Sequence, residues 1–516
     1  MNPKKNNPVL SKLLSSNFLL FYISLFQFLL LIIFAGNYGF FRDEFYYIET
    51  TKHLAFGYVD LQPLSAIILA VSRTIFGDSI LGIRIFAYLA GSITVFVSGL
   101  IAREMNGSKF AQILTAILVV FSTVVLASSS FFSMNSFDIL LSTIFFYYLI
   151  KLLKTNDPKI WITIGIIIGI GLQNKLTFLF LGFGLFIGLL LTKERIYFKS
   201  KYFWIGITIA AAIILPNIIW QISNGFPTIE FMKRAALEKN VSMSFLQFLL
   251  NSSLVLNPIF VIFIFTALYY LFINKTGEKF RLVGLIFIIV LLVFAFNNGK
   301  PYYMGVLYPV MLAAGVLGAD ILIEKYLRKW VRILLVLIII PFVIIITPYA
   351  IPILNVDSFI NFSKFIGIKP GANERLKQSI LPQFYADRFG WKDMVKQVAD
   401  VYNTLTEDEK KDVIIFAQNY GETGAINYYG HLYNLPKAIS GHNSYWEWGY
   451  PKDKSGNIII IVGSNLKDNK EFFEDVKLVG HHYNKYGMPY ENVDIFIGKK
   501  LKFSKKELWT RVKSFI

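Results

Sequence analysis

The chain has 516 residues, of which 55% are hydrophobic and only 16% are charged, whereas soluble domains carry about 25% charged residues. Together with a mean hydropathy of +0.54, this composition predicts an integral membrane protein. The formal net charge is +18, and the absence of cysteine excludes disulfides, thiolate zinc sites and cysteine nucleophiles.

Apolar runs fill roughly the first 350 residues, and at about 20 residues per crossing they predict about eleven membrane spans. The first run follows a lysine-containing segment. It is too long for a signal peptide and lacks a small-residue cleavage site, so we expect an uncleaved span. Residues 61–76 are apolar but short, and we expect a helix in or on the outer leaflet, or a further span. The predicted spans are residues 18–36, 80–102, 110–128, 137–152, 159–173, 176–192, 203–222, 254–273, 282–297, 304–322 and 331–350.

Lysine and arginine are concentrated in every second predicted loop, whereas the short loops between them are poor in both. By the positive-inside rule, the N-terminus is then cytoplasmic and the protein is a multi-pass protein of the plasma membrane. Much of the net charge is therefore a topology signal, and we expect membrane lipids but no nucleic acid as partners. The basic residues of the predicted inner loops are Arg103, Lys109, Lys151, Lys154, Lys159, Lys193, Arg195, Lys199, Lys201, Lys275, Lys279, Arg281, Lys325, Arg328, Lys329 and Arg332.

The composition changes after the last predicted span. Residues 353–516 are charged and predict a soluble α/β domain on the outer side, whereas residues 1–352 form the transmembrane domain. Residues 391–405 have the apolar period of an amphipathic helix. The β-branched runs at 413–417, 457–463 and 493–498 predict strands. The fold class we predict is an α-helical polytopic membrane protein with a C-terminal soluble α/β domain.

With this topology, the polar residues that stand out lie in the outer loops. Ionisable groups at membrane depth are costly and are candidates for function. Each has a structural alternative: Asp138 as a helix N-cap, Lys175 and Lys300 as interfacial lysines, and the first outer loop as a polar loop in an aromatic belt. The candidates are Asp43, Glu44 and Asp60 in the first outer loop (37–79), Asp138 at the start of the fourth span, Lys175 in a tight turn, and Lys300 beside Tyr302 and Tyr303.

Carboxylates and lysines on one outer face beside lipid suit transfer of a sugar from a lipid-linked phosphate. The lysines would neutralise the phosphate and stabilise it as the leaving group. A carboxylate would take the proton from the incoming acceptor hydroxyl.

Several motifs in this order resemble the dolichyl-phosphate-mannose–protein mannosyltransferase-like family (glycosyltransferase family 39), whose members are membrane glycosyltransferases of the GT-C fold. Any one motif is weak, but together they cover nearly the whole chain. They are FRDEFYY (41–47), GYVDLQPL (57–64), GDS (77–79), GLQNK (171–175), GKPYY (299–303), LYP (307–309), NYGETGA (419–425) and SGHNSYW (440–446).

The resemblance implies that Asp43 is the catalytic base and that Glu44 supports it or the acceptor. It implies that Lys175 and Lys300 contact the donor phosphate. Asp60 matches a position where some relatives bind a divalent metal ion. Here Gln62-Pro63 replaces the family's usual Pro-Pro pair, so the metal role is left open. We group Asp60, Asp138, Tyr302 and Tyr303 with the two lysines as substrate-binding residues.

The function that follows is inverting transfer of a sugar from a polyprenyl-phosphate donor to a hydroxyl of a protein, lipid or glycan, on the outer face of the membrane. An alternative is a transporter or flippase for lipid-linked glycans. Such proteins usually have internal repeats and midplane charges, and neither is evident here. A third alternative is a receptor whose outer domain binds glycans. The sequence does not specify the sugar or the acceptor.

Overall fold

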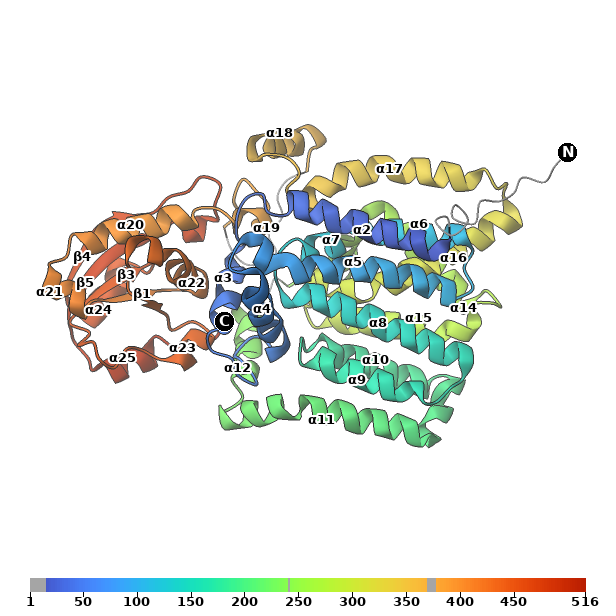
Figure 1. Ribbon diagram of the computed structural model, residues 1–516, viewed down its shortest axis with the longest axis horizontal. Helices are drawn as coiled ribbons and strands as arrows, with labels where there is room; N and C mark the ends of the chain where they lie inside the picture. The colour runs from blue at the N-terminus through green and yellow to red at the C-terminus, as the bar shows by residue number, and fades with distance from the viewer. Residues whose placement is uncertain (1–14, 240–241, 369–376) are drawn as a thin grey trace. The chain divides into compact units, whose positions relative to one another are not determined.

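A computed structural model describes residues 15–239, 242–368 and 377–516 (Figure 1). The chain divides into two compact units. We call the first the helical unit; it comprises Met1–Asn37, Ile75–Ile218 and Ser242–Ile353. The second, which we call the mixed unit, comprises Tyr38–Thr74, Ile219–Val241 and Leu354–Ile516. The lysines of the predicted cytoplasmic N-terminal segment, Lys4, Lys5 and Lys12, lie outside the described residues.

Six helices in the described part of the chain are long and apolar enough to cross a membrane. Three further pairs of consecutive helices are long and apolar enough only when each pair is taken as one segment. The two helices of a pair meet at a sharp bend of 57°, 106° or 107°, in chain order. The six are Ser16–Phe34 (α2), Ile80–Glu104 (α5), Met134–Thr155 (α8), Lys201–Ser223 (α11), Glu278–Phe296 (η4 and α15) and Val331–Ala350 (α17). The bent pairs are Lys109–Val120 (α6) with Thr123–Ser129 (α7), Thr177–Leu190 (α10) with Lys193–Lys199 (η1), and Phe245–Leu256 (α13) with Pro258–Phe272 (η3 and α14).

The predicted count of about eleven spans is not confirmed, because the described helices give six, or nine if each bent pair is one span. Two predicted spans account for the difference. Residues 159–173 contain Ile160–Leu172 (α9), whose 13 residues extend about 20 Å, short of a bilayer core of about 30 Å. Residues 304–322 overlap η5 (Pro301–Val306) and Tyr308–Tyr326 (α16), which carries charged residues in its last turns. Residues 61–76 form the 14-residue helix Pro63–Phe76 (α4), also too short to span upright.

The core of the helical unit is built around α16, which packs against α14, α5 and α6. The approach to α14 is close enough to require glycine. A Cβ atom on Gly315 would lie 2.0 Å from the carbonyl oxygen of Phe263, and one on Gly318 would lie 2.1 Å from that of Thr266. The hydroxyl of Thr266 donates to the Gly315 carbonyl at 2.8 Å. Small residues and hydroxyl bonds of this kind are typical of helix packing in membranes.

The mixed unit contains a five-stranded sheet with strand order β2-β1-β3-β5-β4. Strand β1 is parallel to both β2 and β3, whereas β5 is antiparallel to β3 and β4. Every residue of β3 is buried, as expected of a central strand covered on both faces. The strands are Ile414–Ala417 (β1), Ala438–Ile439 (β2), Ile458–Val462 (β3), Phe473–His481 (β4) and Asp494–Leu501 (β5).

Short helices complete the mixed unit, and α20 and α22 pack against the sheet. The helices are Arg42–Thr50 (α3), α4, Pro227–Arg234 (α12), Ala235–Lys239 (η2), Val356–Ile366 (α18), Gln383–Ala386 (α19), Trp391–Asn403 (α20), Glu407–Asp412 (α21), Tyr420–Tyr429 (α22), Gly430–Tyr433 (η6), Ser444–Trp448 (α23), Leu466–Phe472 (α24), Pro489–Glu491 (η7) and Lys505–Arg511 (α25).

The predicted fold class is confirmed. The helix predicted at 391–405 is α20, and the strands predicted at 413–417, 457–463 and 493–498 are β1, β3 and β5. Strands β2 and β4 were not predicted. The assignment of residues 1–352 as a catalytic domain and 353–516 as an extracytoplasmic domain stays a prediction. The compact unit that contains the sheet also takes in parts of the chain from 38–74 and 219–241.

Candidate functional site

Helix α3 begins with a cap made by its own third residue. The carboxylate of Glu44 accepts the backbone N–H of Phe41 at 2.8 Å, and the N–H of Glu44 donates to the Phe41 carbonyl at 2.9 Å. Glu44 is fully buried. A carboxylate here satisfies an N–H at the helix start and is favoured by the helix dipole. The structure therefore gives Glu44 a capping function, and its predicted catalytic role stays a prediction.

Asp43 is the one residue of α3 that is not buried, and its side chain is 36% exposed. The hydroxyl of Tyr420 donates to Asp43 Oδ1 at 2.8 Å, and Nε of Arg42 lies 3.5 Å from the same oxygen. Tyr420 is the first residue of α22, which packs closely on α3. A Cβ on Gly424 would lie 2.7 Å from Cβ of Phe45, so glycine in the NYGETGA motif permits the approach that brings Tyr420 to Asp43.

Arg42, next to Asp43, is buried in an acidic environment. Its Nη1 lies 4.0 Å from Asp387 Oδ1 and 3.9 Å from Glu491 Oε1, and it contacts the hydroxyl of Tyr490. Its guanidinium also lies 5.2 Å from the ring centroid of Tyr420. The positive charge of Arg42 is therefore paired with carboxylates and aromatic rings of the protein itself.

Two buried glutamates belong to the same cluster. Burial raises the pKa of Glu491 to about 7, against the lowering effect of the Arg42 charge and with the Asp387 charge also raising it. Burial, followed by the charge of Glu491, raises the pKa of Glu422 well above its ordinary value. Burial and the neighbouring negative charges thus favour the protonated, uncharged forms of Glu422 and Glu491 beside Arg42.

Asp60 is held by neutral donors on both of its oxygens. The hydroxyl of Tyr46 donates to Oδ1 at 2.6 Å, and the side-chain amide of Asn443 donates to Oδ2 at 2.8 Å. Burial and then the charge of Asp60 raise the pKa of Tyr46 well above its ordinary value, so the phenol keeps its proton.

The residues around Asp60 do not fit a divalent metal ion. Such an ion needs several oxygen ligands, whereas Tyr46 and Asn443 both point hydrogen-bond donors at the Asp60 carboxylate. Within residues 15–239, 242–368 and 377–516, no three His, Cys, Asp or Glu side chains gather where they could hold a metal.

A second polar cluster lies in the helical unit around Lys175. Its Nζ donates to Asn135 Oδ1 at 2.7 Å and lies 3.9 Å from Asp138 Oδ2. The same Nζ lies 4.5 Å from the ring centroid of Tyr303 and 5.4 Å from that of Tyr302, within the range of cation–π attraction. The side chain of Lys175 is only 10% exposed. Lys175 is therefore buried among protein groups, in contrast to an exposed interfacial lysine.

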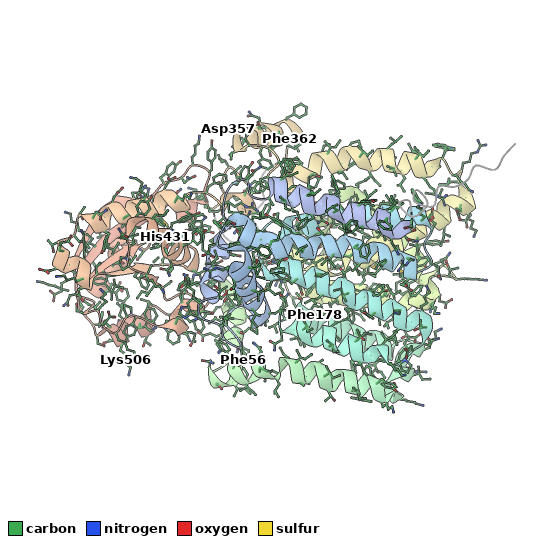
Figure 2. The ribbon with its side chains drawn as sticks, in the orientation of Figure 1. Phe56, Phe178, Asp357, Phe362, His431 and Lys506 are labelled. Carbon is green, nitrogen blue, oxygen red and sulfur yellow. The ribbon has the colours of Figure 1, made fainter. Side chains whose placement is uncertain are left out.

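The turn that carries Lys175 is fixed from two sides. The side-chain amide of Asn174 donates to the carbonyl of Met134 at 2.9 Å, which ties the turn to the start of α8. Gly171 leaves room for the ring of Phe178, labelled in Figure 2, because a Cβ there would lie 2.5 Å from the ring. The GLQNK motif thus places a lysine at a defined position on a rigid turn.

Asp138 is buried in the second turn of α8, and both of its oxygens lie within 2.7 Å of the hydroxyl of Thr177. The alternative that Asp138 caps this helix is wrong. Ser133 is the N-cap, and its hydroxyl accepts the N–H of Asn135 at 3.2 Å. Lys300 is half-buried and precedes η5, which carries Tyr302 and Tyr303.

The structure thus brings Asp138, Lys175, Tyr302 and Tyr303 together in the helical unit, and it places Asp43, Glu44 and Asp60 in the mixed unit. Sequence reasoning assigned no role to their partners. Five of these lie inside motifs that the sequence offered: Arg42 and Tyr46 in FRDEFYY, Tyr420 and Glu422 in NYGETGA, and Asn443 in SGHNSYW. No motif contained the other four, which are Asn135, Thr177, Asp387 and Glu491.

The fold is that of the GT-C membrane glycosyltransferases. ArnT from Cupriavidus metallidurans bound to undecaprenyl phosphate matches with a TM-score of 0.57 at 12% identity, over 85% of this chain and 88% of that chain. The same protein in the apo state matches with a TM-score of 0.57 at 13% identity, over 90% and 93%. The archaeal oligosaccharyltransferase AglB from Archaeoglobus fulgidus, in complex with an inhibitory peptide and a dolichol-phosphate, gives 0.47 at 12% identity, over 85% and 69%.

Residues 60–220 match the family model described as dolichyl-phosphate-mannose-protein mannosyltransferase. This segment contains Asp60, Asp138 and Lys175 but neither Asp43 nor Lys300. No curated protein sequence matches the chain. The resemblance inferred from the motifs is confirmed at the level of a GT-C membrane glycosyltransferase similar to family 39.

Proposed function

We propose that the protein is an inverting glycosyltransferase that moves a sugar from a polyprenyl-phosphate donor to an acceptor hydroxyl on the outer face of the membrane. The observation that carries the proposal is Asp43. In a helix whose other eight residues are buried, this carboxylate alone reaches solvent, and a tyrosine hydroxyl orients it. A carboxylate that is exposed and oriented suits a general base, which must touch its substrate.

In the proposed reaction, Asp43 takes the proton from the acceptor hydroxyl as that oxygen attacks the anomeric carbon of the donor. The bond between the anomeric carbon and the phosphate oxygen breaks, and the polyprenyl phosphate leaves with the electron pair. Attack opposite the leaving group inverts the anomeric configuration. Lys175 and Lys300 stabilise the negative charge on the departing phosphate. No metal-dependent step is included, because the surroundings of Asp60 do not fit one.

The geometry of Lys175 supports a phosphate-binding role. Its closest partner is an uncharged amide at 2.7 Å, followed by one carboxylate oxygen at 3.9 Å and the centroids of two aromatic rings at 4.5 and 5.4 Å. Neutral partners orient the ammonium group without cancelling its charge. Tyr302 and Tyr303 position Lys175, and Asp138, bonded to Thr177, limits where the ammonium can lie.

We further propose that the protein resides in the plasma membrane with a cytoplasmic N-terminus and an extracytoplasmic C-terminal domain. Lysine and arginine are concentrated in every second predicted loop, which supports this orientation. The acceptor is a protein, a lipid or a glycan.

The test is incubation of the protein, purified in lipid nanodiscs, with a panel of polyprenyl-phosphate sugars and candidate acceptors, using mass spectrometry to find an acceptor that gains a sugar. Asp43→Asn keeps the size of the side chain but removes the base, and we expect a loss of about 10²- to 10⁴-fold in rate. Asp400→Asn, in an exposed pair with Lys396, is the matched control and keeps full activity. Full activity in Asp43→Asn would refute the base assignment. Flux of lipid-linked sugar across liposomes without any product would favour a transporter.

A further inference from the structure

Residues 512–516 run beside the SGHNSYW motif within the mixed unit. The backbone N–H of Ser514 donates to the carbonyl of Gly441 at 2.8 Å, and the N–H of Asn443 donates to the carbonyl of Ser514 at 2.9 Å. Glycine is needed at position 441, because a Cβ atom there would overlap the carbonyl oxygen of Val512. The motif therefore has a partner segment that the proposed mechanism does not use.

Side chains on either side of Ser514 anchor this segment. Phe515 is 1% exposed, and its ring packs edge-on against that of Trp446 with the centroids 5.7 Å apart. Nζ of Lys513 donates to Oε2 of Glu230 in α12 at 2.8 Å and lies 4.9 Å from the ring centroid of Trp446. The backbone atoms that the segment presents to the motif are thus held in place.

Ile516 contacts two side chains of the motif, and each of these reaches a residue of the candidate site. Nε2 of His442 lies 2.8 Å from the carbonyl oxygen of Ile516, and Nδ1 of the same ring accepts the backbone N–H of Tyr420 at 3.3 Å. The N–H of Ile516 donates to Asn443 Oδ1 at 3.0 Å, and the amide nitrogen of Asn443 donates to Asp60 Oδ2 at 2.8 Å. The segment is therefore linked by two short paths to Tyr420 and Asp60.

The contact with Tyr420 satisfies a backbone donor at the start of α22. The first N–H groups of a helix have no acceptor within the helix. The N-cap Asn419 accepts those of the two residues after Tyr420, at 2.8 and 3.0 Å, and His442 accepts that of Tyr420 itself. With Nδ1 as acceptor, a neutral imidazole carries its proton on Nε2, where it is donated to the carbonyl of Ile516. The ring of His442 also lies 4.9 Å from that of Tyr420, so one side chain fixes the backbone and the ring of the residue that orients Asp43.

The hydrogen bonds of the two candidate carboxylates are coupled through a pair of tyrosines. The rings of Tyr46 and Tyr420 are stacked, with their centroids 5.1 Å apart and their planes at 30°. The hydroxyl of the first donates to Asp60, and that of the second donates to Asp43. A displacement of Tyr420 would therefore disturb both bonds.

We propose that His442 is a positioning residue for the proposed transfer reaction and that residues 512–516 hold its ring in the required orientation. His442 fixes Tyr420, and the Tyr420 hydroxyl fixes Asp43. The effect on transfer rests on the proposed function, whereas the effect on the position of Tyr420 does not. The orientation of a base counts in the transition state and not in substrate binding, so loss of His442 lowers kcat and leaves KM unchanged.

The first test measures initial rates of transfer by the full-length protein in nanodiscs. His442→Ala lowers kcat about fivefold, the loss expected for one misplaced hydrogen bond. In the Tyr420→Phe background the same change lowers kcat no further, because the hydroxyl through which His442 acts is already absent. His442→Asn, whose side-chain oxygen takes the place of Nδ1, restores most of the wild-type kcat. His431→Ala removes an exposed histidine of η6 (Figure 2) and leaves kcat unchanged.

A pair of variants at one position tests the segment. Ser514→Pro removes the N–H that donates to Gly441, since proline has no backbone donor, and it reproduces the drop in kcat. Ser514→Ala keeps the backbone pairing and retains the wild-type rate.

A measurement that needs no transfer places a fluorotyrosine at position 420, with fluorine beside the hydroxyl. Its fluorine NMR resonance responds to the hydrogen bond of that hydroxyl, and Asp43→Asn gives the resonance position when the carboxylate is absent. His442→Ala and Ser514→Pro move the resonance toward that position, and Ser514→Ala does not. If these shifts occur while the wild-type protein transfers no sugar, the proposed function fails and the positioning of Tyr420 stands.

Two results would overturn the proposal. One is a fluorine resonance that stays in place in His442→Ala or in Ser514→Pro. The other is a fall in kcat of the same size in the wild-type and Tyr420→Phe backgrounds, which would show that the histidine supports the fold in general.

Discussion

The two polar clusters treat a buried cation in opposite ways. In the mixed unit, Arg42 lies among Asp387, Glu491 and the neighbouring Asp43, so its charge is compensated within the protein. In the helical unit, Lys175 has one carboxylate at 3.9 Å and otherwise an amide and two aromatic rings. The difference is that Arg42 has three carboxylates within 4.0 Å, whereas Lys175 has one. Four substitutions probe this contrast.

Arg42→Met should have the largest effect on stability. Removing one partner of a buried ion pair leaves uncompensated charge and typically costs about 3–5 kcal/mol, so we expect a loss of unfolding free energy of that size. Denaturant unfolding of the purified protein measures it. The matched variant is Arg511→Met, which removes a half-exposed pair with Glu507 and should cost less than about 1 kcal/mol. Equal losses in the two variants would mean that Arg42 is not the centre of its cluster.

Lys175→Met should reduce transfer by about 10²-fold, the usual effect of removing one group that stabilises charge in the transition state. The measurement is the initial rate of transfer at fixed donor concentration. Lys201→Met is the control, because Lys201 also lies beside a tyrosine ring, at 5.3 Å, but is exposed. The comparison between the clusters fails if Lys175→Met unfolds the protein as severely as Arg42→Met or transfers sugar at the wild-type rate.

The glutamates of the Arg42 cluster should make stability depend on pH. The pKa of Glu491 rises from its ordinary 4.5 to about 7 in the folded protein, so the folded state binds more protons than the unfolded state between these values. The contribution of Glu491 to stability is then fully present below about pH 4.5 and is lost as pH rises through about 7, an amount on the order of 3 kcal/mol.

Glu491→Gln should flatten that slope, because glutamine keeps the shape and has no proton to lose. Unfolding free energies measured from pH 4.5 to 8 provide the check, with the exposed Glu471→Gln as control. A slope unchanged in Glu491→Gln would assign the pH dependence to other groups.

Tyr420→Phe should have the smallest effect. It removes the hydroxyl that donates to Asp43 but keeps the ring beside Arg42. Water can partly replace the lost bond at this exposed carboxylate, so we expect about 1 kcal/mol, a fivefold drop in kcat with KM unchanged. Tyr486→Phe, which removes a similar bond to Asp357 at 2.9 Å, should leave kcat unchanged. A change confined to KM would indicate that Tyr420 contacts substrate instead of orienting Asp43.

Hydropathy was sufficient to locate most of the apolar helices but could not show where they bend. The break after Val120, for example, lies inside one continuous apolar run. Strand β4 escaped prediction because it is an edge strand whose charged and apolar residues do not alternate strictly. The acidic loop and the lysine turn were evident as motifs. Their contacts with distant residues were not, since Tyr420 and Asp43 are 377 positions apart and no local pattern encodes that contact.

The helices that lead into the mixed unit share one property. In α2, α11 and α17, only 22%, 17% and 17% of the most apolar segment is buried, against 50–67% in the other three long spans. The chain passes into the mixed unit at or near the C-terminal end of each of these three helices. Packing against neighbouring helices is one of the constraints that fix tilt, so helices with fewer protein contacts are freer to tilt when the bilayer thickness changes. The thickness and composition of the membrane thus act on the chain where it enters the unit that carries Asp43.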